Sequence, residues 1–592
     1  MDYYCYDRNE ITVKNTQLAT INFIEQLNNL PNLITHITFG DMFNKKIIKL
    51  PNSIKSLTFG YDFNQSIDNL PNSITHLTFG YNFNQPINNL PNSITHLTFG
   101  YNFNQPINNL PNSITHLTFG YSFNQSVDNL PNSITHLTFG YSFNKSIDNL
   151  PNSITHLTLD HNFYGSTYNL PCSITHLTLG CNNYTLDKLP NSITHLTLKD
   201  NFNLPINNLP NSITHLELGH CFNKCVDNLP NSIISLKFGH DFNKTVDNLP
   251  NSIKYLTFGK NFNQLVDKLP NSISHLIFGD DFNRKMYLLP NSIEILHLGK
   301  KFNCAYKLPE NLKILKFGND FNQDINKLPN KIVKVTFGYN FNKNVFKLPN
   351  SITHLEFGYN FNQSVDNLPR SITHLTFGHY FNQNVDNLPN SITHLTFGYH
   401  FNQSIDYLPN SITHLTFGTN FNQCVDNLPR SITYLTFGDD FNQSVDNLPN
   451  SITHLTFGFN FNKTVDNLPN SIVYLTFGES FNQSIDKIIN TVKILHFNNN
   501  FKLHYENKTK FINNYVVYHG YSYSECKFNN FTITYPTYGY IINLHLQNIV
   551  ELLYFNHEIL LQKLAEYIFN PQRLLRISQK YNLTIDEYIE FL

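Results

Sequence analysis

The sequence is poor in charge, which excludes two broad classes of protein. Charged residues make up 14% of the 592 positions, and 40 Lys and Arg stand against 42 Asp and Glu, for a formal net charge of −2. An average soluble protein has about 25% charged residues. Disordered tails need high net charge and few aromatic residues, and nucleic-acid binders carry a large positive excess. We therefore expect neither a disordered chain nor a nucleic-acid partner.

Cysteine, tryptophan and long apolar runs are also scarce. The chain has 8 Cys and no Trp, which is too few cysteines for a disulfide framework and favours a reducing compartment. No uninterrupted run of apolar residues is long enough to predict a membrane span. The N-terminal sequence MDYYCYDRNE lacks the basic and apolar regions of a signal peptide. These absences predict a cytoplasmic protein without a membrane partner.

Phenylalanine and tyrosine are abundant, with 51 and 33 residues, and they recur at a fixed spacing. The dipeptide Leu-Pro recurs every 20 residues in three runs, with prolines from Pro31 to Pro171, from Pro190 to Pro290 and from Pro309 to Pro469. Residues 71–90 and 91–110 are identical, with the sequence PNSITHLTFGYNFNQPINNL. A fixed period of this size indicates a solenoid, in which neighbouring repeats bury a continuous core. We therefore interpret residues 31–501 as one domain of about 24 repeats.

Within one repeat, the apolar pattern predicts a short strand followed by an extended return arm. Leu77 and Phe79 alternate with polar neighbours, which is the period of a strand with one buried face. We expect Gly80 to adopt a backbone conformation that a β-carbon would penalise. Pro86 disfavours a helix in the remaining ten residues. The expected core positions of the repeat are Ile74, Leu77, Phe79, Phe83, Ile87 and Leu90.

These motifs resemble a known repeat family. The sequence LPNSITHLTFG followed by FNQ resembles the FNIP repeat, and the spacing of Ile74, Leu77 and Phe79 resembles the strand segment of short leucine-rich repeats. FNIP-repeat proteins are known mainly from social amoebae and from giant viruses that infect amoebae. The resemblance implies a mainly β solenoid of leucine-rich-repeat-like coils with parallel strands, and host cytoplasm as the location if the source is viral. A parallel β-helix is the structural alternative.

The resemblance also bears on function. It implies a non-enzymatic repeat scaffold that mediates protein–protein interaction through the concave solenoid face. Family members often carry an N-terminal F-box that docks onto a ubiquitin-ligase scaffold, but residues 1–30 are too few for that module. The alternative function is therefore a substrate-recognition subunit of a ubiquitin ligase without a typical F-box. The sequence names neither the protein partner nor the oligomeric state.

Histidine occupies the first outward position of most strands, where we expect a concave ladder of imidazoles about 5 Å apart. The clearest members of this column are His76, His96, His116, His136, His156, His354, His374, His394 and His414. Repulsion between neighbouring imidazoliums predicts folded-state pKa values below the usual value of about 6.5. It also predicts loss of stability between about pH 6 and 4.

Catalytic, cofactor and metal sites are not expected. No phosphate-binding glycine loop, serine elbow or zinc-protease motif is present, so we expect no enzyme. A flat ladder supplies pairs of imidazoles but not three or four converging ligands. His220, Cys221 and Cys225 form the only metal-like cluster in the sequence, and two thiols four residues apart make an incomplete set.

Two further polar features interrupt or accompany the repeats. The columns of Asn72, Asn84 and Asn89 predict hydrogen-bond ladders at the turns. Segment 284–347 is rich in lysine and is a candidate site for an acidic protein surface or phosphate, unless it reflects divergence under weak constraint. Its candidate binding residues are Arg284, Lys285, Lys300, Lys301, Lys316 and Lys334.

The two ends of the chain depart from the repeat. Residues 1–30 are expected to form an N-terminal cap with a degenerate coil, because an open first coil would expose its core. Residues 502–592 change in texture, and short strand-like runs such as Phe531–Tyr535 precede helical periodicity. The helices are expected at about 548–569, 571–581 and 585–591. This mostly α region is predicted to cover the final coil or to dock a partner.

Overall fold

The computed structural model describes most of the repeat region and short strands near both ends of the chain. The described residues are 12–15, 18–21, 34–47, 49–180, 186, 188–199, 201–325, 328–485, 487–488, 491–492, 494–497, 515–518, 530–534 and 541–545. The chain divides into two compact units, Met1–Leu312 and Lys313–Leu592, which are taken separately below. The helices predicted at 548–569, 571–581 and 585–591 lie outside the described residues, as does most of 1–30.

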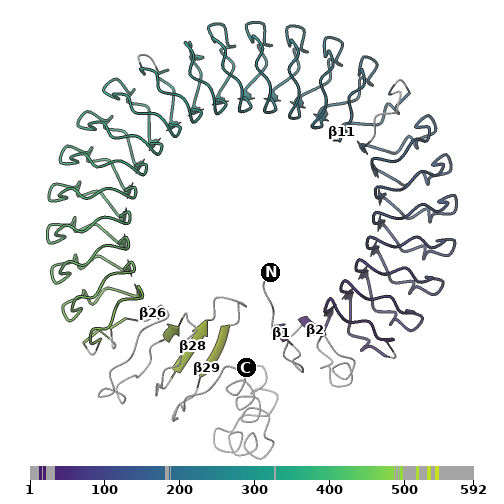
Figure 1. Ribbon diagram of the computed structural model, residues 1–592, viewed down its shortest axis with the longest axis horizontal. Helices are drawn as coiled ribbons and strands as arrows, with labels where there is room; N and C mark the ends of the chain where they lie inside the picture. Colours follow the sequence, from purple (N-terminus) through teal and green to yellow (C-terminus); the bar gives the residue numbers. More distant parts are fainter. Residues whose placement is uncertain are drawn as a thin grey trace, which may run out of the picture. The chain divides into compact units, whose positions relative to one another are not determined.

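The first unit is a ladder of short parallel strands, one from each coil (Figure 1). Its strands are β1 (Thr12–Asn15), β2 (Leu18–Ile21), β3 (His36–Phe39), β4 (Ser56–Thr58), β5 (His76–Thr78), β6 (His96–Thr98), β7 (His116–Thr118), β8 (His136–Thr138), β9 (His156–Leu159), β10 (His176–Leu179), β11 (His195–Leu198), β12 (His215–Leu218), β13 (Ser235–Lys237), β14 (Tyr255–Thr257), β15 (His275–Ile277) and β16 (Ile295–His297). β2 joins β3 in parallel, and β1 pairs antiparallel with β2.

The second unit continues the same pattern within its own bounds. Its strands are β17 (Ile314–Lys316), β18 (Lys334–Thr336), β19 (His354–Glu356), β20 (His374–Thr376), β21 (His394–Thr396), β22 (His414–Thr416), β23 (Tyr434–Thr436), β24 (His454–Thr456), β25 (Tyr474–Phe477), β26 (Ile494–Phe497), β27 (Tyr515–Tyr518), β28 (Asn530–Thr534) and β29 (Ile541–His545). β27 extends the parallel ladder beyond β26, whereas β28 and β29 form an antiparallel pair. The strand-like run expected from Phe531 is β28.

The register of the strands brings equivalent residues of successive coils side by side. His76 pairs with His96 and Leu77 pairs with Leu97, and the same offset recurs through each unit. The return arms contain only turns and extended segments, and no described residue is helical. The described part of the chain therefore holds no helix that could cross a bilayer. The predicted solenoid of parallel strands and extended return arms is confirmed.

The core consists of the six apolar positions that the sequence predicts. In the coil that begins at Pro71, Ile74 and Phe83 are fully buried, and Leu90 is the most accessible of the six at 8%. Phe79 and Phe83 stack within their coil at a centroid distance of 3.8 Å. Each ring also stacks on its copy in the next coil. Two columns of Phe therefore run through the core of each unit and explain most of the phenylalanine content.

Successive coils are wedge-shaped, narrow at the strand and wide at the return arm. The distance between equivalent rings of neighbouring coils is 4.2 Å for His76 and His96 but 5.5 Å for Phe79 and Phe99. It reaches 6.0 Å between Phe83 and its copy. Equivalent atoms lie closest on the inner side of a bend. Consecutive coils therefore turn toward their strands, which puts the outward strand residues on the concave side.

The glycine after each strand is required by the neighbouring coil. A β-carbon built on Gly100 would lie 1.8 Å from the carbonyl oxygen of Gly80, and neither glycine has a φ in the left-handed region. The expectation that this glycine supplies a special backbone conformation is therefore wrong. The residue is glycine because the backbones of consecutive coils meet there without room for a side chain.

A second close contact between coils comes from serine. The hydroxyl of Ser93 donates to the carbonyl of Ile74 in the preceding coil at 2.6 Å, and Ser113 repeats this contact with Ile94. These hydrogen bonds satisfy carbonyls at the start of the strand, where the short ladder leaves them without a strand partner.

Replacing Gly100 with alanine is expected to destabilise the first unit by at least about 3 kcal/mol, because the added methyl meets a backbone carbonyl that cannot move without breaking the ladder. The urea unfolding midpoint measures the change. Asn89→Ala, on an exposed side chain of the same region, is the matched control and should stay within about 0.5 kcal/mol of the wild type. Equal midpoints for the two variants would contradict the steric role of the glycine.

The two phenylalanine columns should differ in tolerance. Leu198 and Leu218 already occupy the Phe99 position and are fully buried there. Phe99→Leu is therefore expected to cost less than about 1.5 kcal/mol. Phe103→Leu should cost more than Phe99→Leu, because the Phe103 ring is fully buried at the centre of the coil, where a smaller side chain leaves a cavity. Denaturant titration of both variants tests this ranking, and a reversed order would refute it.

Candidate functional site

The strand-side face is the surface formed by the outward side chains at His76, Thr78 and Tyr81 and by their equivalents in other coils. Alternation along the strand turns His76 and Thr78 outward while Leu77 enters the core. Tyr81 follows the glycine at the end of the strand. Because the coils stack in register, each position becomes a column, and we call the first and third columns the His stripe and the Tyr stripe.

In the first unit the His stripe is uninterrupted from His76 to His215. Neighbouring ring centroids are 4.0–4.2 Å apart and the rings are nearly parallel. Its predicted members in this unit are His76, His96, His116, His136 and His156, and His176, His195 and His215 continue it. The stripe ends where serine replaces histidine, at Ser56 on one side and Ser235 on the other.

In the second unit the stripe runs through the predicted members His354, His374, His394 and His414. Tyrosine then joins the same stack, since Tyr434 lies 4.4 Å from His414 and 4.2 Å from His454. Imidazole and phenol rings are therefore interchangeable as stacking elements at this position.

Each imidazole is held by the threonine that precedes it. Thr95 Oγ1 lies 2.9 Å from His96 Nδ1 and 3.1 Å from the carbonyl oxygen of Thr75 in the preceding coil. The same contacts recur along both units, for example at Thr373 and His374. Nδ1 is thereby engaged with the threonine hydroxyl, and Nε2 is the ring nitrogen left for other contacts.

Burial and neighbouring imidazoles lower the pKa of several stripe histidines. Partial burial is the larger cause at His96 and His116, followed by the charges that other stripe histidines would carry. At His156 the same causes lower the pKa to about 4. The sequence predicted the direction from repulsion alone, and the structure adds desolvation as the leading cause.

The Tyr stripe was not anticipated from the sequence. Tyr61, Tyr81, Tyr101, Tyr121 and Tyr141 stack at 4.4–4.7 Å, and Tyr61 is 49% exposed. The sequence feature that could have predicted this stripe is the tyrosine that follows the glycine at the end of many strands.

The pKa of one tyrosine of this stripe is raised, and the second unit has a Tyr stripe of its own. Partial burial, and then the hydroxyls of the two flanking tyrosines, raise the pKa of Tyr101. In the second unit a shorter stripe runs through Tyr339, Tyr359, His379 and Tyr399.

In the first unit, the candidate cations of segment 284–347 lie on two different edges of the coils. Arg284 and Lys285 lie on a return arm, where Arg284 Nε donates to the carbonyl of Asn263 at 2.9 Å. Lys300 and Lys301 lie in the turn after β16. Lys300 takes the Tyr81 position of the strand-side face, and Lys301 Nζ is 2.6 Å from an Asp281 carboxylate oxygen. The structure therefore does not gather these four side chains into one patch.

In the second unit, Lys316 and Lys334 lie on adjacent strands of the strand-side face. Both side chains are exposed, and the two strands pair in parallel. Lys334 occupies the histidine position beside His354, and its charge adds to burial in lowering the pKa of that imidazole. These two lysines place positive charge next to one end of the His stripe.

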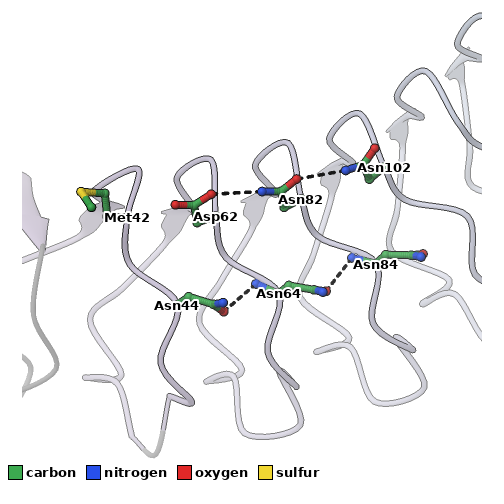
Figure 2. A pocket seen from close by; sticks show the side chains of 7 residues that line it. All are labelled: Met42, Asn44, Asp62, Asn64, Asn82, Asn84 and Asn102. Carbon is green, nitrogen blue, oxygen red and sulfur yellow. Dashed lines mark hydrogen bonds between the residues drawn. The ribbon is translucent and has the colours of Figure 1, made fainter.

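Amide ladders flank a polar groove of about 690 Å³ on another edge of the first coils (Figure 2). The Asn102 amide donates to the Asn82 side-chain oxygen at 3.0 Å, and Asn82 donates in turn to Asp62. In the second row, the Asn84 backbone N–H donates to the Asn64 side-chain oxygen at 2.9 Å. The prediction of a ladder is confirmed for the Asn84 column.

The Asn89 column also forms hydrogen bonds from coil to coil, as predicted, with an aspartate of the preceding coil as the acceptor. Asn149 donates to Asp128 at 3.1 Å, and Asn427 donates to Asp406 at 2.9 Å in the second unit. Asn72 is exposed. Most residues that line the groove of Figure 2 are asparagines, whose side chains form hydrogen bonds from one coil to the next.

The cysteines of the metal-like cluster do not lie together with His220 as a ligand set. Cys225 Sγ contacts an Asp227 carboxylate oxygen on the return arm at 2.7 Å. His220 instead stacks on His240, at 4.3 Å, and lies beside Asp241. Sequence analysis did not group His240 and Asp241 with His220 because they belong to the next coil.

Comparison with known proteins identifies the repeat. A family model described as FNIP Repeat matches residues 26–62, 43–82, 63–102, 83–122, 103–142, 123–162, 143–182, 182–221, 222–261, 242–281, 262–301, 302–340, 341–380, 364–400, 381–420, 401–440, 425–460 and 441–480. A search of curated proteins gives no match to the chain.

Among solved structures, the chain is similar to CroV588, described as a novel circular LRR protein structure. The two are 43% identical over 84% of this chain and 87% of that chain, with a TM-score of 0.70. YopM from Yersinia enterocolitica is 17% identical over 78% of this chain and 91% of its own, with a TM-score of 0.32. A chain of the Toll–Spatzle complex of Drosophila is 11% identical over 86% and 88%, with a TM-score of 0.39.

Acidification is expected to destabilise the repeat region. A lowered folded-state pKa means that the unfolded chain binds more protons, so the contribution of the stripe is present above pH 6.5 and is lost as pH falls toward 4. Hydrogen-bonded carboxylates such as Asp128 have a pKa lowered from 3.8, so their contribution is lost mainly below about pH 5. Melting temperatures measured from pH 7 to pH 4 should therefore fall.

A matched variant separates the contribution of the His stripe to the acid response from that of other titrating groups. H116Y/H136Y/H156Y keeps stacking rings, as Tyr434 does naturally, but removes three titrating imidazoles. Its melting temperature should fall less than that of the wild type over the same pH range. Identical losses in the two proteins would show that the stripe does not set the acid response.

Proposed function

Because the chain belongs to the FNIP-repeat family and folds as a solenoid of leucine-rich-repeat type, we propose that it is a non-enzymatic scaffold that binds a protein partner through its strand-side face. The observation that supports this proposal most directly is the exposed Tyr stripe beside the His stripe. Tyrosine is enriched at protein interfaces, because its ring supplies apolar area and its hydroxyl supplies a hydrogen bond.

The stacked rings suit binding because they are already ordered. Tyr101 and Tyr121 are 36% and 38% exposed, yet each is confined between two neighbouring rings at 4.4–4.7 Å. Immobilising a flexible side chain costs about 0.5–1.5 kcal/mol on binding, and pre-ordered side chains avoid much of this cost. A face made of such rings can therefore contribute affinity with little loss of entropy.

The chemistry of the face favours protein over carbohydrate or nucleic acid. Sugars stack on the faces of aromatic rings, and here the faces of the inner tyrosines are covered by their neighbours. The ring edges and hydroxyls remain outward, as hydrogen-bonding and apolar groups at a spacing of one coil. A phosphate backbone needs clustered cations, and the His stripe is neutral where its pKa values are lowered.

Departures from the repeat give the face its individual sites. Lys316 and Lys334 add positive charge to the strand-side face of the second unit. An acidic segment of a partner would be attracted there, and its register along the otherwise uniform columns would be fixed. Because they lie on paired neighbouring strands, these two lysines are the part of the lysine-rich segment that we propose for partner binding.

The proposal is tested by affinity capture from host-type lysate with three forms of the full chain. The face variant is Y81S/Y101S/Y121S, and the matched control is Q85A/Q105A/Q125A on the return arms of the same coils. Partners captured by the wild type and the control but lost with the face variant are expected. Truncating a hot-spot tyrosine at an interface costs about 2 kcal/mol or more, a roughly 30-fold loss of affinity for one residue.

The outcomes are distinguishable. Partners that persist with the face variant and disappear with the return-arm variant would overturn the assignment of the face. Recovery of ubiquitin-ligase scaffold components among the face-dependent partners would identify the protein as a substrate-recognition subunit. Thermal melts of all three forms confirm that the substitutions leave the solenoid folded.

A further inference from the structure

Two coils of the first unit replace the tyrosine after the glycine with histidine. His220 and His240 are consecutive members of that column, and their rings stack at 4.3 Å with an interplanar angle of 7°. The next residue in the second of these coils is Asp241. Register between the coils therefore brings two imidazoles and a carboxylate together, although 20 residues separate the histidines.

The ligand atoms of these three side chains are close and accessible. One ring nitrogen from each histidine and a carboxylate oxygen all lie within 4.8 Å of one another. His240 Nδ1 is 2.9 Å from the Asp241 oxygen, and these two side chains are 34% and 38% exposed. In the described part of the chain, no other group of three His, Cys, Asp or Glu side chains meets this condition.

We propose that His220, His240 and Asp241 bind a first-row transition metal ion of the Zn²⁺ class, with water completing the coordination. Two imidazole nitrogens and one carboxylate oxygen form a ligand set typical of open zinc sites. Tetrahedral coordination at bond lengths of about 2.0–2.1 Å puts ligand atoms roughly 3.4 Å apart. Binding therefore requires rotation about the side-chain torsions, which turns the stacked rings toward the ion and closes the present separations of up to 4.8 Å.

The surroundings hold the ligands in place. The Asp241 backbone N–H donates to the His220 carbonyl at 2.8 Å, which fixes the spacing between the two coils. The Asn261 amide donates to the Asp241 side-chain oxygen at 3.0 Å and orients the carboxylate. Hydrogen bonds of this kind to ligand side chains raise metal affinity.

One neighbouring charge opposes the ion. Lys260 follows His240 in the same column of the next coil, and its ammonium would repel a bound cation. Removing that charge is therefore expected to tighten binding. Cys221 occupies the Asp241 position one coil earlier, but its sulfur is not among the grouped ligand atoms. The thiols of the sequence-level cluster are thus not part of the proposed set.

The experiment titrates untagged, EDTA-treated full-length protein with ZnCl₂ by calorimetry, and with CoCl₂ by visible absorption, which reports the coordination geometry. The wild type should bind one ion more tightly than any others. H240N and D241N should each weaken the binding of that ion at least about 10-fold, because each removes a ligand. K260N should strengthen it several-fold.

H116N is the matched control, because it removes an imidazole from the His stripe and leaves the three ligands in place. It should retain the tight ion. Loss of that ion in H116N, or unchanged titrations in both H240N and D241N, would overturn the proposal. Melting temperatures measured without metal establish that each variant is folded, so that a loss of binding is not a loss of structure.

Discussion

The structure depends on the close approach of one coil to the next at the end of each strand. There the backbone of Gly100 meets the carbonyl of Gly80 so closely that a β-carbon has no room. This contact fixes the translation from coil to coil, and strand hydrogen bonds and the Ser93 contact hold it. The translation then sets the distance between every residue and its copy in the neighbouring coil.

This short spacing restricts each column to side chains that can lie next to identical side chains of the neighbouring coils. Charged columns would place like charges about 5 Å apart, so the repeat uses neutral groups that stack or exchange hydrogen bonds. Phe83 stacks in the core, and Tyr101 stacks outside. Asn84 forms an amide ladder. Histidine is the borderline case, because it is neutral when deprotonated and repels its copies once protonated. At His156, burial first and this repulsion second lower the pKa.

The sequence predicted what a single repeat contains, and it failed where the outcome depended on neighbouring coils. The period, the six buried positions and the Asn84 ladder follow from one repeat, because alternation and side-chain chemistry are local. Gly80 was correctly singled out for a wrong reason, since its constraint is a carbonyl 20 residues away. The Tyr stripe was missed because one exposed tyrosine has no meaning until the register stacks it on its copy. Asp241 was missed for the same reason.

The register of a partner along a repeated face has to depend on the places where the copies differ. A perfect column offers the same contact at every coil, so a partner bound to it could shift by one coil at little cost. Lys334 in the His stripe, and the pair His220 and His240 in place of tyrosine, each mark a unique position along their unit. Under the proposed function, the repeated rings would supply contact area and the substitutions would fix the register of the partner. The near-identity of the remaining coils is then compatible with specific binding.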